Sequence, residues 1–178
     1  MMSSTVARRY ALALFQIAKE QQLLDQMEEE LRVVKETVSD NEDLQAVLKS
    51  PKLTKEKKKE ILATAFANVN PHVLNTLKLL IDRHRENIIS DVAYDFIELS
   101  NEEKGIAEAK VYSVRPLTDE EKEAFSTTYA AKVGKKSLRV ENIVDTDLLG
   151  GIKIRIGNRI LDGSLKGKLD RLGRQLLG

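Results

Sequence analysis

Residues 88–114 read IISDVAYDFIELSNEEKGIAEAKVYSV, and the pattern of apolar side chains changes within this stretch. Up to Lys104, apolar residues recur at three- and four-residue steps, which is typical of one face of a helix. The segment from Ile106 to Val114 has the composition of a strand. All nine glycines of the chain stand at or after Gly105. We therefore predict two domains, residues 1–104 and 105–178, that meet at Lys104-Gly105.

Composition excludes several classes of protein. The chain has 178 residues, of which 42% are hydrophobic and 32% charged, as expected for a globular protein rather than a disordered one. It has no cysteine, which excludes disulfides, thiolate metal sites and cysteine nucleophiles. Aromatic residues make up only 4%, so a stacking platform for single-stranded nucleic acid is not expected. No apolar run is long enough to span a bilayer, and we expect an intracellular protein without an anchor of its own.

Residues 1–104 are predicted to form a six-helix all-α bundle. The expected helices span residues 5–21, 24–38, 41–48, 54–66, 71–81 and 88–104. Ser4 or Thr5, Asp40 or Asn41, and Thr54 are of the residue types that cap helix N-termini. Pro71 suits the first turn of the fifth helix.

Residues 105–178 are predicted to form a small C-terminal α+β domain in the order β-α-β-β-β-α. Thr118 and Glu121 have the spacing of a capping box, which places the start of a helix that reaches about Val133. Alternating stretches predict strands at 138–143, 152–156 and 159–161. The last helix, capped by Asp162 or Ser164, carries leucines on one face: Leu165, Leu169, Leu172 and Leu176. The whole chain is thus a two-domain α+β protein.

The first and fifth helices carry more apolar residues than one buried face requires. In the first, two stripes are apolar: Val6, Tyr10, Ala13, Leu14 and Ile17, and Ala7, Ala11, Phe15 and Ala18. The fifth is apolar at Val73, Leu74, Leu77, Leu79, Leu80 and Ile81. The spacing is consistent with two helices central in the bundle, and equally with two adjacent helices that bind an amphipathic helix of another protein.

No catalytic or cofactor-binding motif is complete. The two histidines, His72 and His84, lack a metal-binding spacing, and Gly134-Lys-Lys-Ser137 lacks the first glycine of a phosphate-binding loop. The loop that begins at Asp145 resembles a calcium loop only in its opening residues. We expect no enzyme activity, no cofactor and no metal.

The C-terminal end of the chain is basic. Residues 150–178 hold seven Lys or Arg side chains and two Asp side chains. Such a segment favours an acidic protein or a phosphate backbone as partner. Because no nucleic-acid motif accompanies it, we favour the acidic protein; a small basic nucleic-acid-binding protein or a helical adaptor is the alternative.

Four stretches in the right order resemble a known family. They are ARRYALALFQIA at 7–18, LKSP at 48–51, NTLKLLIDRHR at 75–85 and DTDLLGGIKIRIGNRILDGSLKGKL at 145–169. Together they resemble the delta subunit of bacterial F-type ATP synthase, the counterpart of the mitochondrial oligomycin-sensitivity-conferring protein.

The resemblance implies a non-catalytic stator subunit that links the catalytic head to the peripheral stalk and resists rotor torque. It implies that residues 1–104 bind the N-terminal helix of an alpha subunit through the first and fifth helices: Tyr10, Ala13, Leu14, Ile17, Leu74, Leu77, Lys78 and Ile81. We expect a charge at Leu14 or Leu77 to weaken this binding without unfolding the bundle.

The resemblance further implies that residues 105–178 bind the b subunits of the stalk, and we assign this contact to the last helix: Lys166, Leu169, Arg171, Leu172 and Leu176. The expected setting is one copy in a hetero-oligomeric membrane complex, peripheral on the cytoplasmic face of the bacterial cell membrane. No direct membrane insertion and no nucleic-acid partner are expected.

Overall fold

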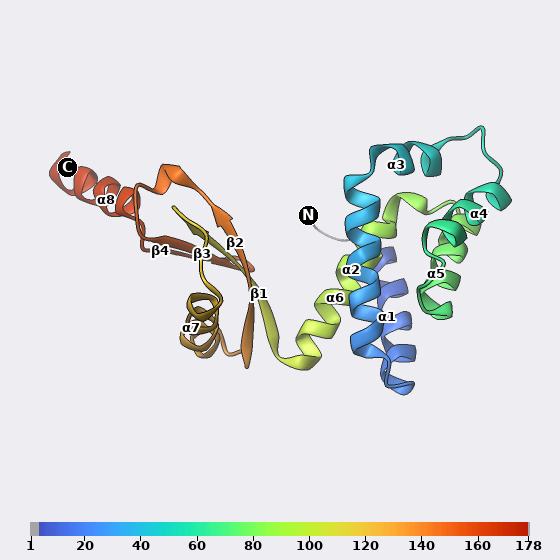
Figure 1. Ribbon diagram of the computed structural model, residues 1–178, viewed down its shortest axis with the longest axis horizontal. Helices are drawn as coiled ribbons and strands as arrows, with labels where there is room; N and C mark the ends of the chain where they lie inside the picture. The colour runs from blue at the N-terminus through green and yellow to red at the C-terminus, as the bar shows by residue number, and fades with distance from the viewer. Residues whose placement is uncertain (1–3, 178) are drawn as a thin grey trace. The chain divides into compact units, whose positions relative to one another are not determined.

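The computed structural model describes residues 4–177, and the side chains of 176 and 177 lie outside that description. The chain divides into two compact units, Met1–Ser100 and Asn101–Gly178. Helices make up the first unit, whereas the second contains a sheet with helices (Figure 1). The predicted α+β class is therefore confirmed.

Local capping chemistry marks where several helices of the first unit begin. The helices are α1 (Thr5–Glu20), α2 (Leu24–Asp40), α3 (Glu42–Lys49), α4 (Lys55–Ala65), α5 (Pro71–Asp82) and α6 (Ile89–Lys104), the last preceded by the 3₁₀ turn η1 (Glu86–Ile88). Ser4, Asn41 and Thr54 each accept a hydrogen bond from a backbone N–H three residues ahead, at 3.1, 2.9 and 3.3 Å. These side chains satisfy N–H groups that a helix start leaves unpaired.

The core of the first unit is formed mainly by buried apolar residues of α1, α2, α5 and α6, with Leu48 of α3 and Leu62 of α4. Phe15 of α1 and Phe96 of α6 meet edge to face with ring centroids 6.1 Å apart. The apolar stripe predicted for α2 points inward, since Met27, Leu31 and Val34 are all buried.

Two buried polar contacts join elements of the first unit. The carboxyl group of Glu28 on α2 accepts hydrogen bonds from Arg32, at 2.9 Å, and from the hydroxyl of Ser100 on α6, at 2.6 Å. Lys58 of α4 donates to Glu86 of η1 at 2.7 Å. Each contact compensates a charged group that has been removed from water.

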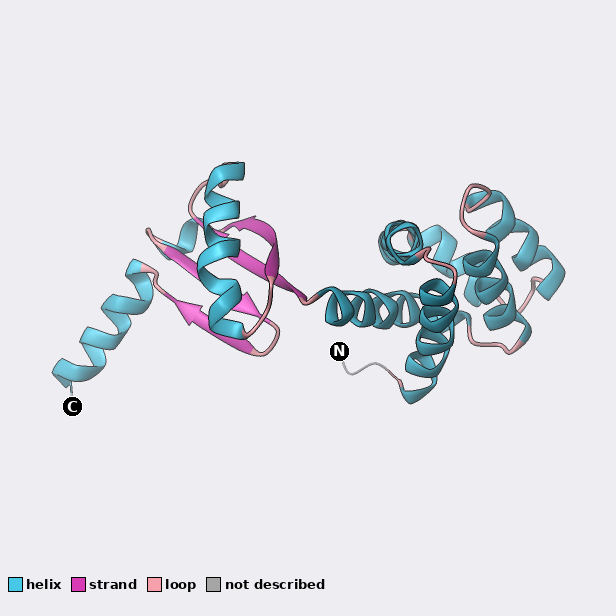
Figure 2. Ribbon diagram, turned by 90° about the horizontal axis from the view of Figure 1, so that it is seen from below, coloured by secondary structure: helices cyan, strands magenta, loops and turns pink. Residues whose placement is uncertain are grey.

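The second unit is a four-stranded mixed sheet with the strand order β2-β1-β3-β4. Its elements are β1 (Ile106–Ser113), α7 (Asp119–Ala130), η2 (Ala131–Val133), β2 (Ser137–Val144), η3 (Thr146–Leu148), β3 (Ile152–Ile156), β4 (Arg159–Asp162) and α8 (Leu165–Leu177). β1 pairs in parallel with β2 and antiparallel with β3, and β4 is antiparallel to β3. The crossover helix α7 lies over one face of the sheet, where its apolar side chains pack on β1, β2 and β3 (Figure 2).

The helix predicted to reach Val133 is shorter in the structure. α7 ends at Ala130 and continues as a 3₁₀ turn to Val133. Gly134 then takes a left-handed backbone with φ of +69°, which ends the turn.

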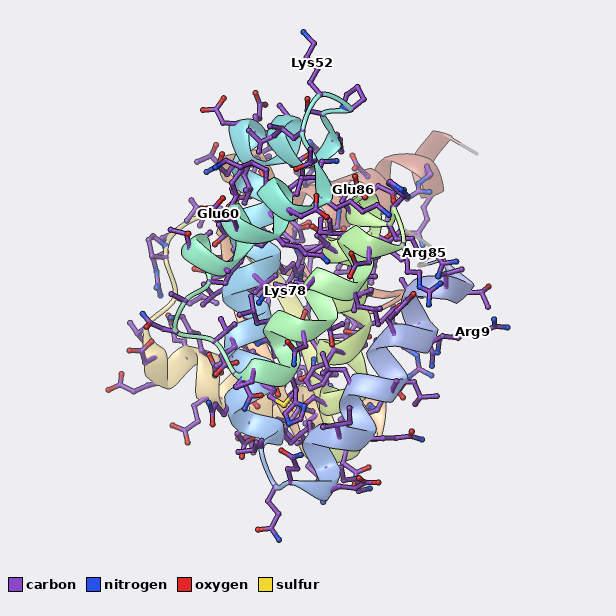
Figure 3. All side chains as sticks on the ribbon, turned by 90° about the vertical axis from the view of Figure 1, so that its right-hand side faces the viewer. Arg9, Lys52, Glu60, Lys78, Arg85 and Glu86 are labelled. Carbon is purple, nitrogen blue, oxygen red and sulfur yellow. The ribbon has the colours of Figure 1, made fainter. Side chains whose placement is uncertain are left out.

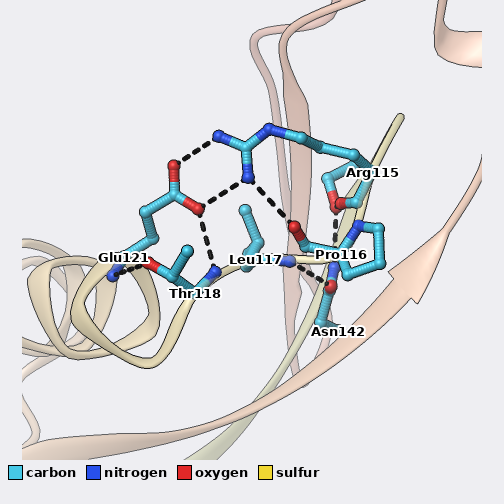
Figure 4. Close-up of polar contacts among 7 residues, drawn as sticks. Arg115, Pro116, Leu117, Thr118, Glu121 and Asn142 are labelled. Carbon is cyan, nitrogen blue, oxygen red and sulfur yellow. Dashed lines mark hydrogen bonds and ion pairs between the residues drawn. The ribbon is translucent and has the colours of Figure 1, made fainter.

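A polar network fixes the N-terminus of α7 against the sheet (Figure 4). Arg115 donates to both carboxylate oxygens of Glu121, at 2.9 and 2.7 Å. Glu121 also accepts from the backbone N–H of Thr118, and its own N–H donates to the Thr118 hydroxyl, which completes the predicted capping box. Asn142 of β2 accepts from Leu117 N–H and donates to the carbonyl of Val111 in β1.

The capping network should make stability depend on pH. Hydrogen bonds from Arg115, and then from the backbone at Thr118, lower the pKa of Glu121 from its ordinary 4.5 to about 2. Because the unfolded chain takes up this proton more readily, the network's contribution is complete above pH 4.5 and is lost as the pH falls toward 2.

We expect Glu121→Gln to flatten the pH dependence of the thermal unfolding midpoint in this range, measured by circular dichroism. Glu120→Gln changes an exposed carboxylate in the same helical turn and is the matched control. An equal flattening in both variants would contradict the assignment to Glu121.

Candidate partner-binding surfaces

The first candidate site lies on α1 and α5, which pack side by side in the first unit. Of the eight residues predicted there, Ala13 is exposed, and Tyr10, Ile17, Leu74 and Lys78 are partly exposed. We call these five residues the α1–α5 surface. Its members are mostly apolar, with one lysine as the charged group.

The other three predicted residues are part of the core. Leu14, Leu77 and Ile81 are only 2%, 2% and 1% exposed. A charge at Leu14 or Leu77 would therefore enter the packed interior of the unit, and the expectation that it would leave the fold intact is wrong. Helical spacing identified these residues as apolar but could not distinguish contact with a partner from contact with the rest of the bundle.

A polar link holds the start of α1 to the end of α5. Arg85, just beyond α5, donates to the hydroxyl of Tyr10 at 3.0 Å, and its guanidinium lies 5.7 Å from the centre of the Tyr10 ring. Figure 3 shows Lys78 midway along α5 and Arg85 where the chain leaves that helix. Sequence reasoning did not find this contact, which joins residues 75 positions apart. It orients Tyr10 at the edge of the α1–α5 surface.

Two leucines, one on each of these helices, face solvent rather than the core. Leu12 of α1 and Leu79 of α5 are 45% and 43% exposed. They lie away from the buried faces of their helices, so the surplus apolar character of α1 and α5 is accounted for partly by core residues and partly by exposed ones.

The second candidate site is the leucine face of α8. Leu165, Leu169 and Leu172 are 49%, 59% and 54% exposed, and we call these three residues the α8 surface. The predicted basic residues Lys166 and Arg171 are also exposed on this helix. Leu176 belongs to the predicted set, but its side chain lies outside the described residues.

Tight packing before α8 fixes where that helix begins. A side chain at Gly151 would place its first carbon 2.6 Å from the carbonyl oxygen of Gly163, so only glycine fits there. Ser164 is buried, and its hydroxyl accepts from Gly167 N–H at 3.0 Å while donating to Asp162 at 2.6 Å. Of the two predicted caps, Ser164 is therefore the one that bonds to the helix backbone, and Asp162 accepts a hydrogen bond from Ser164.

The part of the chain that the structure describes holds no group of three or more His, Asp or Glu side chains placed to bind a metal ion. Within residues 4–177, no helix combines the length and apolar character needed to cross a membrane.

Comparison with known proteins gives a consistent family. Residues 6–176 match the family model described as ATP synthase delta (OSCP) subunit. The protein named ATP synthase subunit delta from Anoxybacillus flavithermus is 56% identical over 176 residues, which cover 99% of each chain. Proteins of the same name from Geobacillus sp. strain WCH70 and Bacillus mycoides are 55% and 50% identical over 97% and 99% of this chain, and 97% and 98% of their own.

A solved structure has the same fold over nearly the whole chain. A chain in the cryo-EM structure of the Toxoplasma gondii mitochondrial ATP synthase hexamer superposes with a TM-score of 0.75 and 22% sequence identity. The match covers 98% of this chain and 99% of the other. At this identity the likeness concerns the fold.

Burial predicts opposite outcomes for two neighbouring substitutions in α1. Leu14→Glu places a carboxylate in the core and should destabilise the first unit by roughly 3 kcal/mol or more. Ala13→Glu places it in solvent and should change the unfolding free energy by less than about 0.5 kcal/mol. Urea titration followed by circular dichroism distinguishes the two, and equal unfolding midpoints would contradict the described burial.

Proposed function

The chain belongs to the ATP synthase delta (OSCP) subunit family and is a non-catalytic stator component of F-type ATP synthase, and we propose that its two units hold two different parts of that enzyme. The first unit binds the N-terminal helix of an alpha subunit on the catalytic head. The second binds the b subunits of the peripheral stalk. A protein attached at both ends prevents the head from turning with the rotor.

The α1–α5 surface supports the first contact. It offers apolar side chains from two adjacent helices, which is what the apolar face of an amphipathic helix requires. Lys78 lies among them and can pair with an acidic residue on such a helix. Leu14, Leu77 and Ile81 of the same two helices are buried and belong to the core of the unit.

The α8 surface supports the second contact. Exposed leucines repeat at three- and four-residue steps along a helix, which is the pattern of a helix–helix seam. They lie in a segment that is strongly basic, so an acidic helical partner would match it in both shape and charge. This exposed leucine face is the observation that most strongly supports the proposed role, in which one unit binds the head and the other binds the stalk.

The proposed setting is what membership of the family implies. One copy of the chain would attach to the complex on the cytoplasmic face of the bacterial membrane. The attachment would be peripheral, through protein contacts alone.

Titration calorimetry with two probes tests the proposal on the full chain. The probes are an N-terminal peptide of the cognate alpha subunit and a soluble fragment of the cognate b subunit. We expect each to bind one-to-one with a negative heat-capacity change, as burial of apolar surface requires.

Substitutions then assign the surfaces. Ala13→Glu should lower the affinity for the alpha peptide at least about tenfold, which corresponds to 1.4 kcal/mol, and leave the affinity for the b fragment unchanged. Leu169→Glu should lower the affinity for the b fragment and leave the affinity for the alpha peptide unchanged. Leu12→Glu changes an exposed apolar position on another side of α1 and is the control for the first variant. Absence of binding of both probes by the folded chain would contradict the proposed role.

A further inference from the structure

Leu149 combines an unfavourable backbone with an exposed apolar side chain. Its φ is +60° and its side chain is 68% exposed, the largest value among the exposed large hydrophobic residues of the described chain. Two other non-glycine residues, Gln22 and His84, have positive φ, but both are polar and follow helix ends. A left-handed backbone is costly for a residue with a branched apolar side chain.

The turn itself does not require a leucine. Leu149 closes the 3₁₀ turn η3, where its N–H donates to the carbonyl of Thr146 at 3.3 Å. Glycine or asparagine would make the same backbone bond in this conformation at lower cost. A backbone outlier of this kind supports a hypothesis of function when it places a side chain at a surface used for binding.

Packing of the next residues places Leu149 beside α8. The backbone N–H of Leu165 donates to the carbonyl of Gly150 at 2.9 Å. A side chain at Gly150 would lie 2.8 Å from Cδ1 of Leu165, so the loop backbone rests directly on the first leucine of the α8 surface. Leu149 thus precedes, by one residue, the point where the loop touches that surface.

We propose that Leu149 extends the α8 surface and inserts into the acidic helical partner that this surface binds, so that the loop and the helix hold the partner together. The inference rests on the proposed function, in which that partner is the b subunit. The charge of this segment favours an acidic partner over a second copy of the chain. Residues 150–178 carry seven basic and two acidic side chains and would repel the same segment of another copy. Because the η3 turn already holds the backbone at Leu149, this residue loses little further backbone freedom on binding.

Leu149→Asn separates binding from folding. Asparagine tolerates the left-handed backbone, so the thermal unfolding midpoint should stay the same or rise. The affinity of the full-length variant for the soluble b fragment should fall at least about tenfold, because a large apolar contact is lost. Val33→Gln, which replaces a 56% exposed residue on α2, is the control and should bind the fragment as the wild type does.

The outcomes separate the role of Leu149 from the proposed stalk contact on which it depends. If Leu169→Glu abolishes binding while Leu149→Asn binds normally, the role of Leu149 is overturned and the stalk contact stands. If the wild type does not bind the fragment, both the role of Leu149 and the proposed stalk contact are overturned. A drop of several degrees in the unfolding midpoint of Leu149→Asn would make Leu149 a packing residue. Sedimentation that shows a wild-type dimer, lost in this variant, would identify a second copy as the occupant and overturn the proposal.

Discussion

A carboxyl group almost completely excluded from water fixes where two long helices of the first unit meet. Glu28 of α2 is 1% exposed, and it is compensated by Arg32 on its own helix and by Ser100 on α6. A charge in this position is tolerated only when its hydrogen-bonding partners are in place. The requirement selects one register of α2 against α6, and α6 supplies much of the apolar core, including Phe96.

Each unit has a hydrophobic core of its own, and this separation matters for the proposed binding of a different partner by each unit. The buried apolar cluster of the first unit ends at Phe96, and that of the second begins at Ala109. Side chains with no shared neighbours contribute additively to stability. A change on the α8 surface can therefore alter one contact without loosening the bundle that carries the other. Independent cores allow the two surfaces to differ in charge and shape.

Sequence reasoning succeeded where the deciding chemistry is local. Asn41, Thr54 and the pair Thr118–Glu121 act within three residues, so residue type and spacing were sufficient to place the helix starts. The order of strands was not predicted, because β1 pairs with residues 31 positions later, as Ile106 does with Ser137. Such pairing depends on how α7 packs across the sheet, and no short stretch encodes it.

The candidate sites show the same division between local and distant information. A stripe of leucines shows that a helix has an apolar face, but the tertiary packing decides what covers it. On α5 the stripe is largely covered by the bundle, as Leu77 shows, whereas on α8 it is open, as Leu169 shows. Leu149 gave no signal at all, because leucine is not a residue type associated with a left-handed backbone.

The two surfaces differ in a way that suits a protein held at both ends. The α1–α5 surface offers mainly partly exposed side chains above a tightly packed core, while the α8 surface offers large leucines in a basic segment. In the proposed role the chain joins the head and the stalk in series, so the loss of either contact would free the head from the stalk. Each contact must therefore be long-lived under torque on its own. Because the α8 contact would combine apolar and charged groups while the α1–α5 contact would be mainly apolar, raised salt would weaken the α8 contact more.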